Sequence, residues 1–133
     1  MKTLLRLLLV PALLLFLVPS GGGAQEKKVT PGLYDMVPDA NFSADFDPNG
    51  VIIEFTDAVM TATMQGQLLV KSKFSLTGDI MTVEDLEGQV ACPGIAKFKV
   101  TFTEKGFRMT PVEDPCAERG AVLAQVTMVK KKG

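Results

Sequence analysis

The 133-residue chain contains no His and no Trp, and it has only two Cys and one Tyr. Without His, and with both Cys expected in a bridge, the usual pairs of nucleophile and general base cannot be assembled. Two Cys alone supply too few soft ligands for a zinc site. An immunoglobulin-like sandwich would more naturally carry a Trp against its bridge. We therefore expect no enzyme, no metal site and no cofactor, and we disfavour that sandwich.

Carboxylates are the remaining candidates for chemistry. Paired carboxylates can hydrolyse glycosides, and loop carboxylates can bind calcium together with carbonyl groups. Both acidic clusters of this chain lie at expected strand ends or loops, where solvated acids are the usual case, and neither follows a cation-loop motif. A carboxylate active site and a calcium site stay open as alternatives to a non-enzymatic protein. The clusters are Glu84, Asp85 and Glu87, and Glu113, Asp114 and Glu118.

The one long apolar run, residues 7–18, follows Lys2 and Arg6 and precedes small residues that end at Ala24. This order is typical of a secretory signal peptide, so we assign residues 1–24 to it and place cleavage after Ala24. The run is shorter than the roughly 20 residues of a membrane span. We expect an exported protein, periplasmic or extracellular, with no stable membrane span after processing. A retained N-terminal anchor is the alternative.

Positive and negative charges nearly balance, since the chain has 14 basic and 15 acidic residues. Removal of Lys2 and Arg6 with the leader increases the acidic excess, which argues against a nucleic-acid surface. The one basic cluster, residues 130–132, is typical of a solvated C-terminal tail. We expect no nucleic-acid partner.

Cys92 and Cys116 are the two cysteines of the chain. In an oxidising compartment an even number of Cys usually forms bridges, so we predict a disulfide between them. Closing a loop of about 25 residues stabilises a fold by roughly 3 kcal/mol in the chain-entropy model. A reactive thiol is the alternative, but it needs a neighbour such as His to stabilise the thiolate.

From Asn41 onward, runs of alternating apolar and polar residues are separated by Gly, Asn, Asp or Pro about every ten residues, which is typical of an antiparallel meander. The clearest alternation is Ala96, Phe98, Val100 and Phe102 with Lys or Thr between them. No segment shows a convincing helical period. We predict strands over residues 42–46, 51–55, 57–64, 68–76, 80–86, 96–103, 107–112 and 121–129.

About eight such strands with one apolar face would leave open sheet edges unless the ends of the sheet pair with each other. We therefore predict an all-β fold, an antiparallel up-and-down β-barrel of about eight strands. The barrel domain is expected to span residues 41–133. Residues 25–40 are expected to form a leader segment of the mature chain that crosses one end of the barrel.

The expected interior is rich in Met and Phe. Thioether side chains adapt to irregular apolar surfaces, so such a lining suits a small hydrophobic ligand. The alternative is a core that the side chains fill completely, because small barrels often leave no cavity. The predicted ligand-binding residues are Met60, Met64, Phe74, Met81, Phe98, Val100 and Phe102.

Landmark residues follow one another in an order known from a protein family, and Asp114-Pro115-Cys116-Ala117-Glu118-Arg119 is the most specific of them. They are Gly78 and Asp79, Asp85 and Gly88, Ala91 and Cys92, and Asp114, Cys116 and Arg119. Over residues 41–129 this order resembles small exported bacterial proteins of lipocalin-like type. The resemblance implies an eight-stranded barrel with an internal cavity, and it implies no particular ligand. Gly32-Leu33-Tyr34 differs from the Gly-x-Trp of lipocalins by its Tyr.

Asp114 and Arg119 are expected to form an ion pair that shapes the loop around the bridge, and a ligand-binding role of Arg119 is the alternative. If exposed, the pair would contribute at most about 1 kcal/mol. The predicted function is that of an exported, non-enzymatic binding protein that holds a small hydrophobic ligand in its barrel. A protein-binding or inhibitor module of the cell envelope, with a filled core and with binding loops at residues 88–95 and 113–120, is the alternative.

Overall fold

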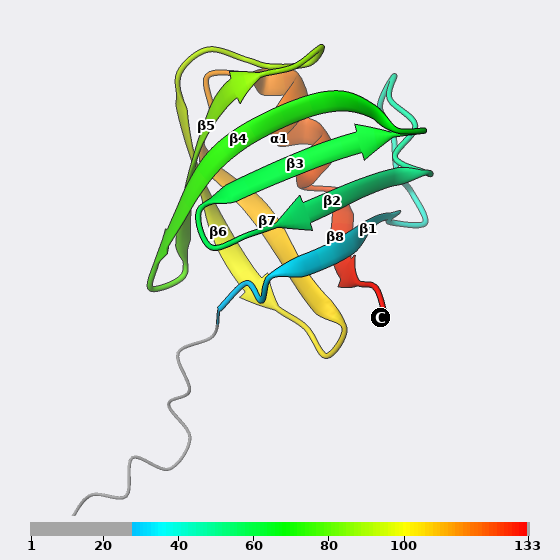
Figure 1. Cartoon of the computed structure of the whole chain (residues 1–133), viewed down its shortest axis with the longest axis horizontal. Coiled ribbons are helices and arrows are strands. Elements are labelled where there is room, and N and C mark those ends of the chain that lie inside the picture. The colour runs from blue at the N-terminus through cyan, green and yellow to red at the C-terminus, as the bar shows by residue number, and fades with distance from the viewer. Residues whose placement is uncertain (1–27, 133) are drawn as a thin grey trace, which may run out of the picture.

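The computed structural model describes residues 28–132, and in it eight antiparallel strands close into one barrel in chain order (Figure 1). The predicted all-β up-and-down barrel is confirmed. The predicted signal peptide, residues 1–24, lies outside the described residues. The elements are β1 Gly32–Pro38, β2 Val51–Phe55, β3 Val59–Met64, β4 Gln67–Thr77, β5 Ile80–Glu87, β6 Ile95–Phe102, β7 Gly106–Glu113, α1 Ala117–Leu123 and β8 Val126–Lys130.

Alternation of apolar and polar residues explains the central strands. In β6, Ala96, Phe98 and Val100 are buried, whereas Lys97 and Lys99 are exposed. Successive side chains of a strand point to opposite faces, so this pattern puts one face toward the core and the other toward water. The strands β2 to β7 therefore agree with the sequence-based prediction to within a few residues at each end.

The first strand differs from the prediction. The strand predicted over residues 42–46 is wrong, because this segment belongs to the connection between β1 and β2, where Phe42 and Phe46 pack against the core. The barrel instead begins with β1, inside the segment predicted as a leader. Tyr34 and Met36 of β1 point inward, but apolar Leu33 and Val37 point outward and hide the alternation.

Long-range pairing decides that this segment is a strand. β1 pairs with β2 on one side, with Tyr34 opposite Ile53, and with β8 on the other side, with Met36 opposite Met128. The second pairing joins the two ends of the sheet and closes the barrel. The β8 partners of β1 lie 88 to 96 positions away in the chain, as in the pairs Pro38–Val126 and Tyr34–Lys130. A local sequence pattern therefore does not predict this pairing.

The helix α1 also differs from the prediction, which placed a polar loop over residues 113–120 and a strand from residue 121. The chain forms a helix at Ala117–Leu123, and β8 starts only at Val126. Seven residues are too few to show a helical period in the sequence. Gly120 and Leu123, three positions apart, are its buried residues, so tertiary packing stabilises this short helix.

Aromatic side chains fill the barrel near the β2–β3 and β6–β7 turns. The rings of Tyr34, Phe55 and Phe107 meet edge to face, with centroids 5.2 to 5.6 Å apart, and Phe74 packs on Phe55 at 5.3 Å. The Tyr34 hydroxyl donates a hydrogen bond of 2.7 Å to the carbonyl oxygen of Thr30. The protein's own side chains therefore fill the middle of this half, and outside them a depression of about 1050 Å³ opens at the end of the barrel.

Candidate functional site

A cavity of about 430 Å³ opens at the other end of the barrel, between the strand ends, α1 and the loop of residues 88–94. Its walls are mostly apolar, and acidic and basic groups lie on one side. Inward side chains of β1 to β4 form the floor, Phe46 approaches from the β1–β2 connection, and α1 covers one side. The apolar wall residues are Met36, Phe46, Val51, Ile53, Met60, Ala62, Leu69, Val70, Val90, Ala91, Val122 and Leu123.

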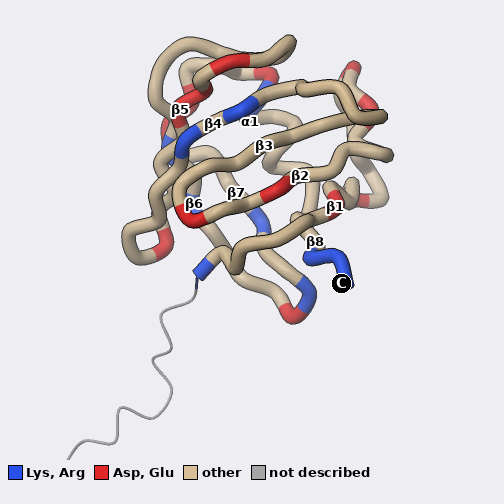
Figure 2. The backbone as a smooth tube through the Cα atoms, in the orientation of Figure 1, with Lys and Arg blue, Asp and Glu red and all other residues tan. Residues whose placement is uncertain are grey.

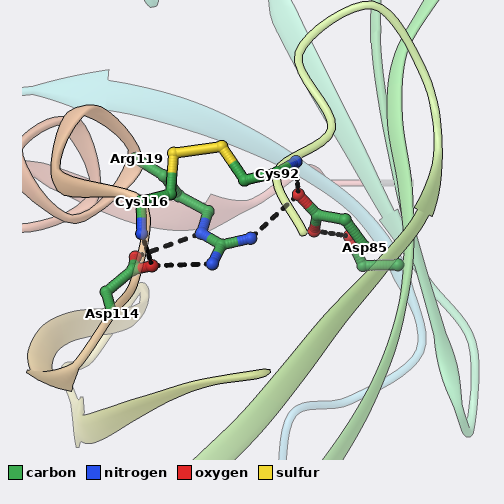
Figure 3. A network of polar contacts seen from close by, with 6 residues as sticks. Asp85, Cys92, Asp114, Cys116 and Arg119 are labelled. Carbon is green, nitrogen blue, oxygen red and sulfur yellow. Dashed lines mark hydrogen bonds and ion pairs between the residues drawn. A yellow bond between two sulfur atoms is a disulfide. The ribbon is translucent and has the colours of Figure 1, made fainter. Parts of the chain in front are cut away.

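The predicted disulfide between Cys92 and Cys116 is present. It borders this cavity. It joins the β5–β6 connection to the residue that precedes α1 (Figure 3). Gly88 starts the β5–β6 connection at a φ of +130°, and a Cβ at this position would overlap the backbone of Leu69. The loop therefore lies close on β4, and glycine is required there.

Arg119 of α1 binds two carboxylates beside the disulfide (Figure 3). Its Nη2 and Nε donate to the two oxygens of Asp114 at 2.7 and 3.1 Å, and its Nη1 donates to Oδ2 of Asp85 at 2.8 Å. The side chain of Arg119 is only 13% exposed, and both aspartates are 3% exposed. The pair expected between Asp114 and Arg119 is thus present, but it is buried and has a second acid, Asp85.

Each aspartate also holds the backbone of one half-cystine. Oδ2 of Asp85 accepts the Cys92 N–H at 2.9 Å, and Oδ1 of Asp114 accepts the Cys116 N–H at 2.8 Å. Oδ1 of Asp85 further accepts the hydroxyl of fully buried Ser72 at 2.7 Å. Arg119 thereby joins the same two loops that the disulfide joins. Within residues 28–132, no buried side-chain nitrogen or oxygen lacks a partner.

Electrostatics keep this network charged. The hydrogen bonds from Arg119 to Asp114 raise the pKa of the guanidinium, and the charges of Asp85 and Asp114 add to this effect, whereas partial burial opposes it. Two carboxylates around one guanidinium leave the network with a net negative charge. Removing one partner from a buried ion pair leaves the other charge uncompensated, which is far more costly than the loss of an exposed pair.

The seven predicted ligand-binding residues do not meet in one place. Met60 lines the cavity. Phe74, Val100 and Phe102 lie at the opposite end of the barrel, in a wider depression that Lys28, Asp57, Asp79 and Lys99 also line. Met81 and Phe98 are completely buried, and Met64 is partly buried against the core. Inward position alone does not separate a residue of the filled core from a residue of a cavity.

Several cavity residues were not predicted. Met36 lies on the unpredicted strand β1, and Val122 and Leu123 lie on the unpredicted helix. Phe46 lies in the segment 42–46, for which the sequence predicts a strand and the structure shows a connection. Asp85 stood out in the sequence only as part of an acidic cluster and of the family resemblance. Its partner Arg119 lies 34 positions away, and only the folded chain brings the two together.

Comparisons with known proteins give no relative: no family model, no curated protein and no solved structure matches the chain. In the part of the chain that the structure describes, no helix is long and apolar enough to cross a membrane. Among the same residues, no three or more His, Cys, Asp or Glu side chains gather in a way that could hold a metal ion.

Proposed function

We propose that this protein is an exported, non-enzymatic binding protein that holds a small hydrophobic molecule in the mouth of its barrel. The cavity of about 430 Å³ with mostly apolar walls carries the proposal. Binding sites for small molecules typically measure roughly 300–1,000 Å³ and are lined mainly by apolar side chains with a few placed polar groups.

The filled half of the barrel limits how deep a ligand can enter. The aromatic cluster of Tyr34, Phe55 and Phe107 and the buried side chains of Met81 and Phe98 occupy the interior beyond the cavity. A ligand would therefore bind at the mouth, between the strand ends and α1. The disulfide and the Arg119 network hold the loops of the mouth in place, which lowers the entropy lost on binding.

Two measurements test this function. Native mass spectrometry of the purified protein, incubated with a bacterial lipid extract, should detect a bound small molecule. N-phenylnaphthylamine, a neutral dye that fluoresces in apolar surroundings, should bind with a single saturable phase. If the mass stays that of the free protein and the dye fluorescence does not rise, the proposed function is wrong.

A matched pair of variants locates the site. Ala62→Leu adds a branched alkyl group to the cavity wall and should weaken dye binding at least about tenfold, equivalent to about 1.4 kcal/mol. Ala121→Leu adds the same group at an exposed position of α1 outside the cavity walls and should leave binding unchanged. Equal effects of the two variants would place the dye elsewhere.

A protein-binding function has one observation in its favour. Leu86, Ile95 and Val112 are 51%, 53% and 62% exposed on the neighbouring strands β5, β6 and β7, near the cavity end of the barrel. Exposed apolar patches mark interaction surfaces. A photo-crosslinker at position 112 should then give one discrete adduct in the cell envelope, and the same group at exposed position 101, farther along the outer face, should give none.

A further inference from the structure

We propose that the ligand of the mouth cavity is a cationic amphiphile: an apolar body with an ammonium head. This inference rests on the proposed function and specifies the chemistry of the molecule that the cavity takes. It follows from the state of Arg119, from the acids at the rim and from the distribution of charge between the two ends of the barrel.

Arg119 already has two acidic partners. Among the described residues that line the cavity it is the one basic side chain, and three of the five N–H groups of its guanidinium donate to Asp85 and Asp114. A fatty-acid carboxylate that bound the remaining N–H groups would become a third negative group around one positive charge. The repulsion between these carboxylates, next to two buried aspartates where water screens little, opposes an anionic head.

The rim itself is acidic. Asp85 and Asp114 share the single positive charge of Arg119, so this network, of which Asp85 and Arg119 line the cavity, carries a net negative charge. Glu118, the residue before Arg119 on α1, also lines the cavity and is exposed. A positive head at the rim would therefore face the exposed carboxylate of Glu118, next to the net negative charge of the Arg119 network, while the apolar body contacts the floor.

The distribution of charge between the two ends of the barrel also favours a cationic ligand at the mouth. In the described chain the connections at the mouth contain five acidic residues and one basic residue, although Asp39 is paired with Arg108 of β7. The segments at the other end contain four Lys, one of them paired with Asp35 of β1, and three acidic residues, Asp57, Asp79 and Glu104. Figure 2 shows acidic segments in the loops around the mouth and the basic C-terminal segment at the other end, where the turns carry acidic residues as well. The mouth residues are Asp39, Asp45, Asp47, Asp114, Glu118 and Arg119, and the four Lys are Lys28, Lys105, Lys131 and Lys132. Such a field attracts cations to the mouth and repels anions.

The test compares two amphiphiles of equal chain length, decyltrimethylammonium and decanoate, by titration calorimetry and by displacement of N-phenylnaphthylamine. Both are used below their micelle-forming concentrations, with the disulfide of the protein intact. We expect the cation to bind at least about fivefold more tightly than the anion at low ionic strength, and the ratio to shrink in high salt.

Two charge variants separate the rim from the general charge of the protein. Glu118→Gln should lower the ratio of cation to anion affinity by about two- to fivefold, because it removes the exposed carboxylate beside the head. Glu104→Gln removes the same charge from the β6–β7 turn at the far end of the barrel and should leave the ratio unchanged.

Each outcome decides the proposal. If decanoate binds as tightly as the cation while the dye also binds, the cationic ligand class is wrong and the proposed function stands. If Glu118→Gln and Glu104→Gln have the same effect, the head does not lie at this rim and the inference is also wrong. If neither amphiphile nor the dye binds, the proposed function fails together with it.

Discussion

Arg119 joins groups from three parts of the chain at the barrel mouth. Its guanidinium binds Asp85 at the end of β5 and Asp114 after β7, and these acids hold the backbone of Cys92 and Cys116. Hydrogen bonds between ionised groups are shorter and stronger than those between neutral groups. The residue therefore has a structural role that its position on a short surface helix does not reveal.

Substitution of Arg119 by Met tests this role. Because the variant leaves two buried aspartates without their counter-charge, we expect it to lower the free energy of unfolding by about 3 kcal/mol, the lower end for a broken buried pair. Denaturant unfolding with the disulfide intact measures the change. Arg108→Met, which breaks the half-exposed pair with Asp39, is the comparison and should cost less. Equal losses would contradict the buried network as a source of stability.

Asp39 contributes to the stability of the fold in a pH-dependent way, and the direction of this dependence follows from its pKa. The bidentate hydrogen bonds from Arg108, at 2.7 and 2.8 Å, hold the pKa of Asp39 below its ordinary value of 3.8. Because the folded-state pKa is the lower one, the pair stabilises the protein above the unfolded pKa and stops doing so as the pH falls through the folded value.

The corresponding experiment compares the wild-type protein with Asp39→Asn. The wild type should be the more stable at neutral pH, and the difference should vanish as the pH falls well below 3.8, because Asp39 is then protonated in both states. Denaturant unfolding at a series of pH values measures this difference. Arg108→Gln should abolish the same part of the pH dependence, and an unchanged profile in that variant would rule out the pair as its cause.

At the scale of elements, the disulfide and the Arg119 network tie the same two segments together. The bridge closes a loop between residues 24 positions apart. The network holds both loops independently of the sulfur atoms. The disulfide and the Arg119 network stabilise the fold in different ways. The disulfide acts mainly by restricting the unfolded chain, whereas the network acts in the folded state.

Replacement of both Cys92 and Cys116 by Ser should therefore destabilise the barrel without unfolding it. We expect a loss of about 3 kcal/mol from the free energy of unfolding, with the far-ultraviolet circular dichroism of a β-protein retained. Combining this double replacement with Arg119→Met should release both loops and abolish dye binding at the mouth. Full dye affinity in the combined variant would show that the loops do not shape the site.

At the scale of the whole molecule, closure depends on β1, which pairs with both β2 and β8. Tyr34 is its main anchor, since its ring contacts Phe55 and Phe107 and its hydroxyl binds the Thr30 carbonyl. Burial of one such ring therefore supports the pairing that removes the open edges of the sheet.

Tyr34→Ala should lower the free energy of unfolding by about 3–5 kcal/mol, as for other large aromatic side chains removed from a core. Tyr34→Phe keeps the ring and should cost only about 1 kcal/mol for the lost hydrogen bond. Leu33→Ala, on the exposed face of the same strand, should change stability by less than about 0.5 kcal/mol. Thermal and denaturant unfolding compare the three variants. A small loss in Tyr34→Ala would mean that β1 is held by backbone pairing alone.

Features that depend on residues close together in the chain could be predicted from the sequence, and features that depend on distant residues could not. Turns such as Asp47-Pro48-Asn49-Gly50 were readable because their chemistry is local: the Asn49 N–H binds Oδ1 of Asp47, and Gly50 adopts a φ of +84°. The segment 42–46 shows the limit of that reading. It alternates like a strand, but no neighbouring strand is available to pair with it, and it forms a loop whose Phe side chains pack on the core.

By itself, the sequence determined that the chain is an antiparallel β-protein with a bridge between Cys92 and Cys116, because strand alternation has a period of two and can be read locally. The tertiary structure decided the rest. Pairing of β1 with β8 and the meeting of Asp85 with Arg119 join segments that are distant in the chain. The helix α1 packs on its chain neighbours β7 and β8, and its seven residues are too few to show a helical period. The cavity at the mouth is a volume that packed elements leave between them, so it exists only once those distant segments have met.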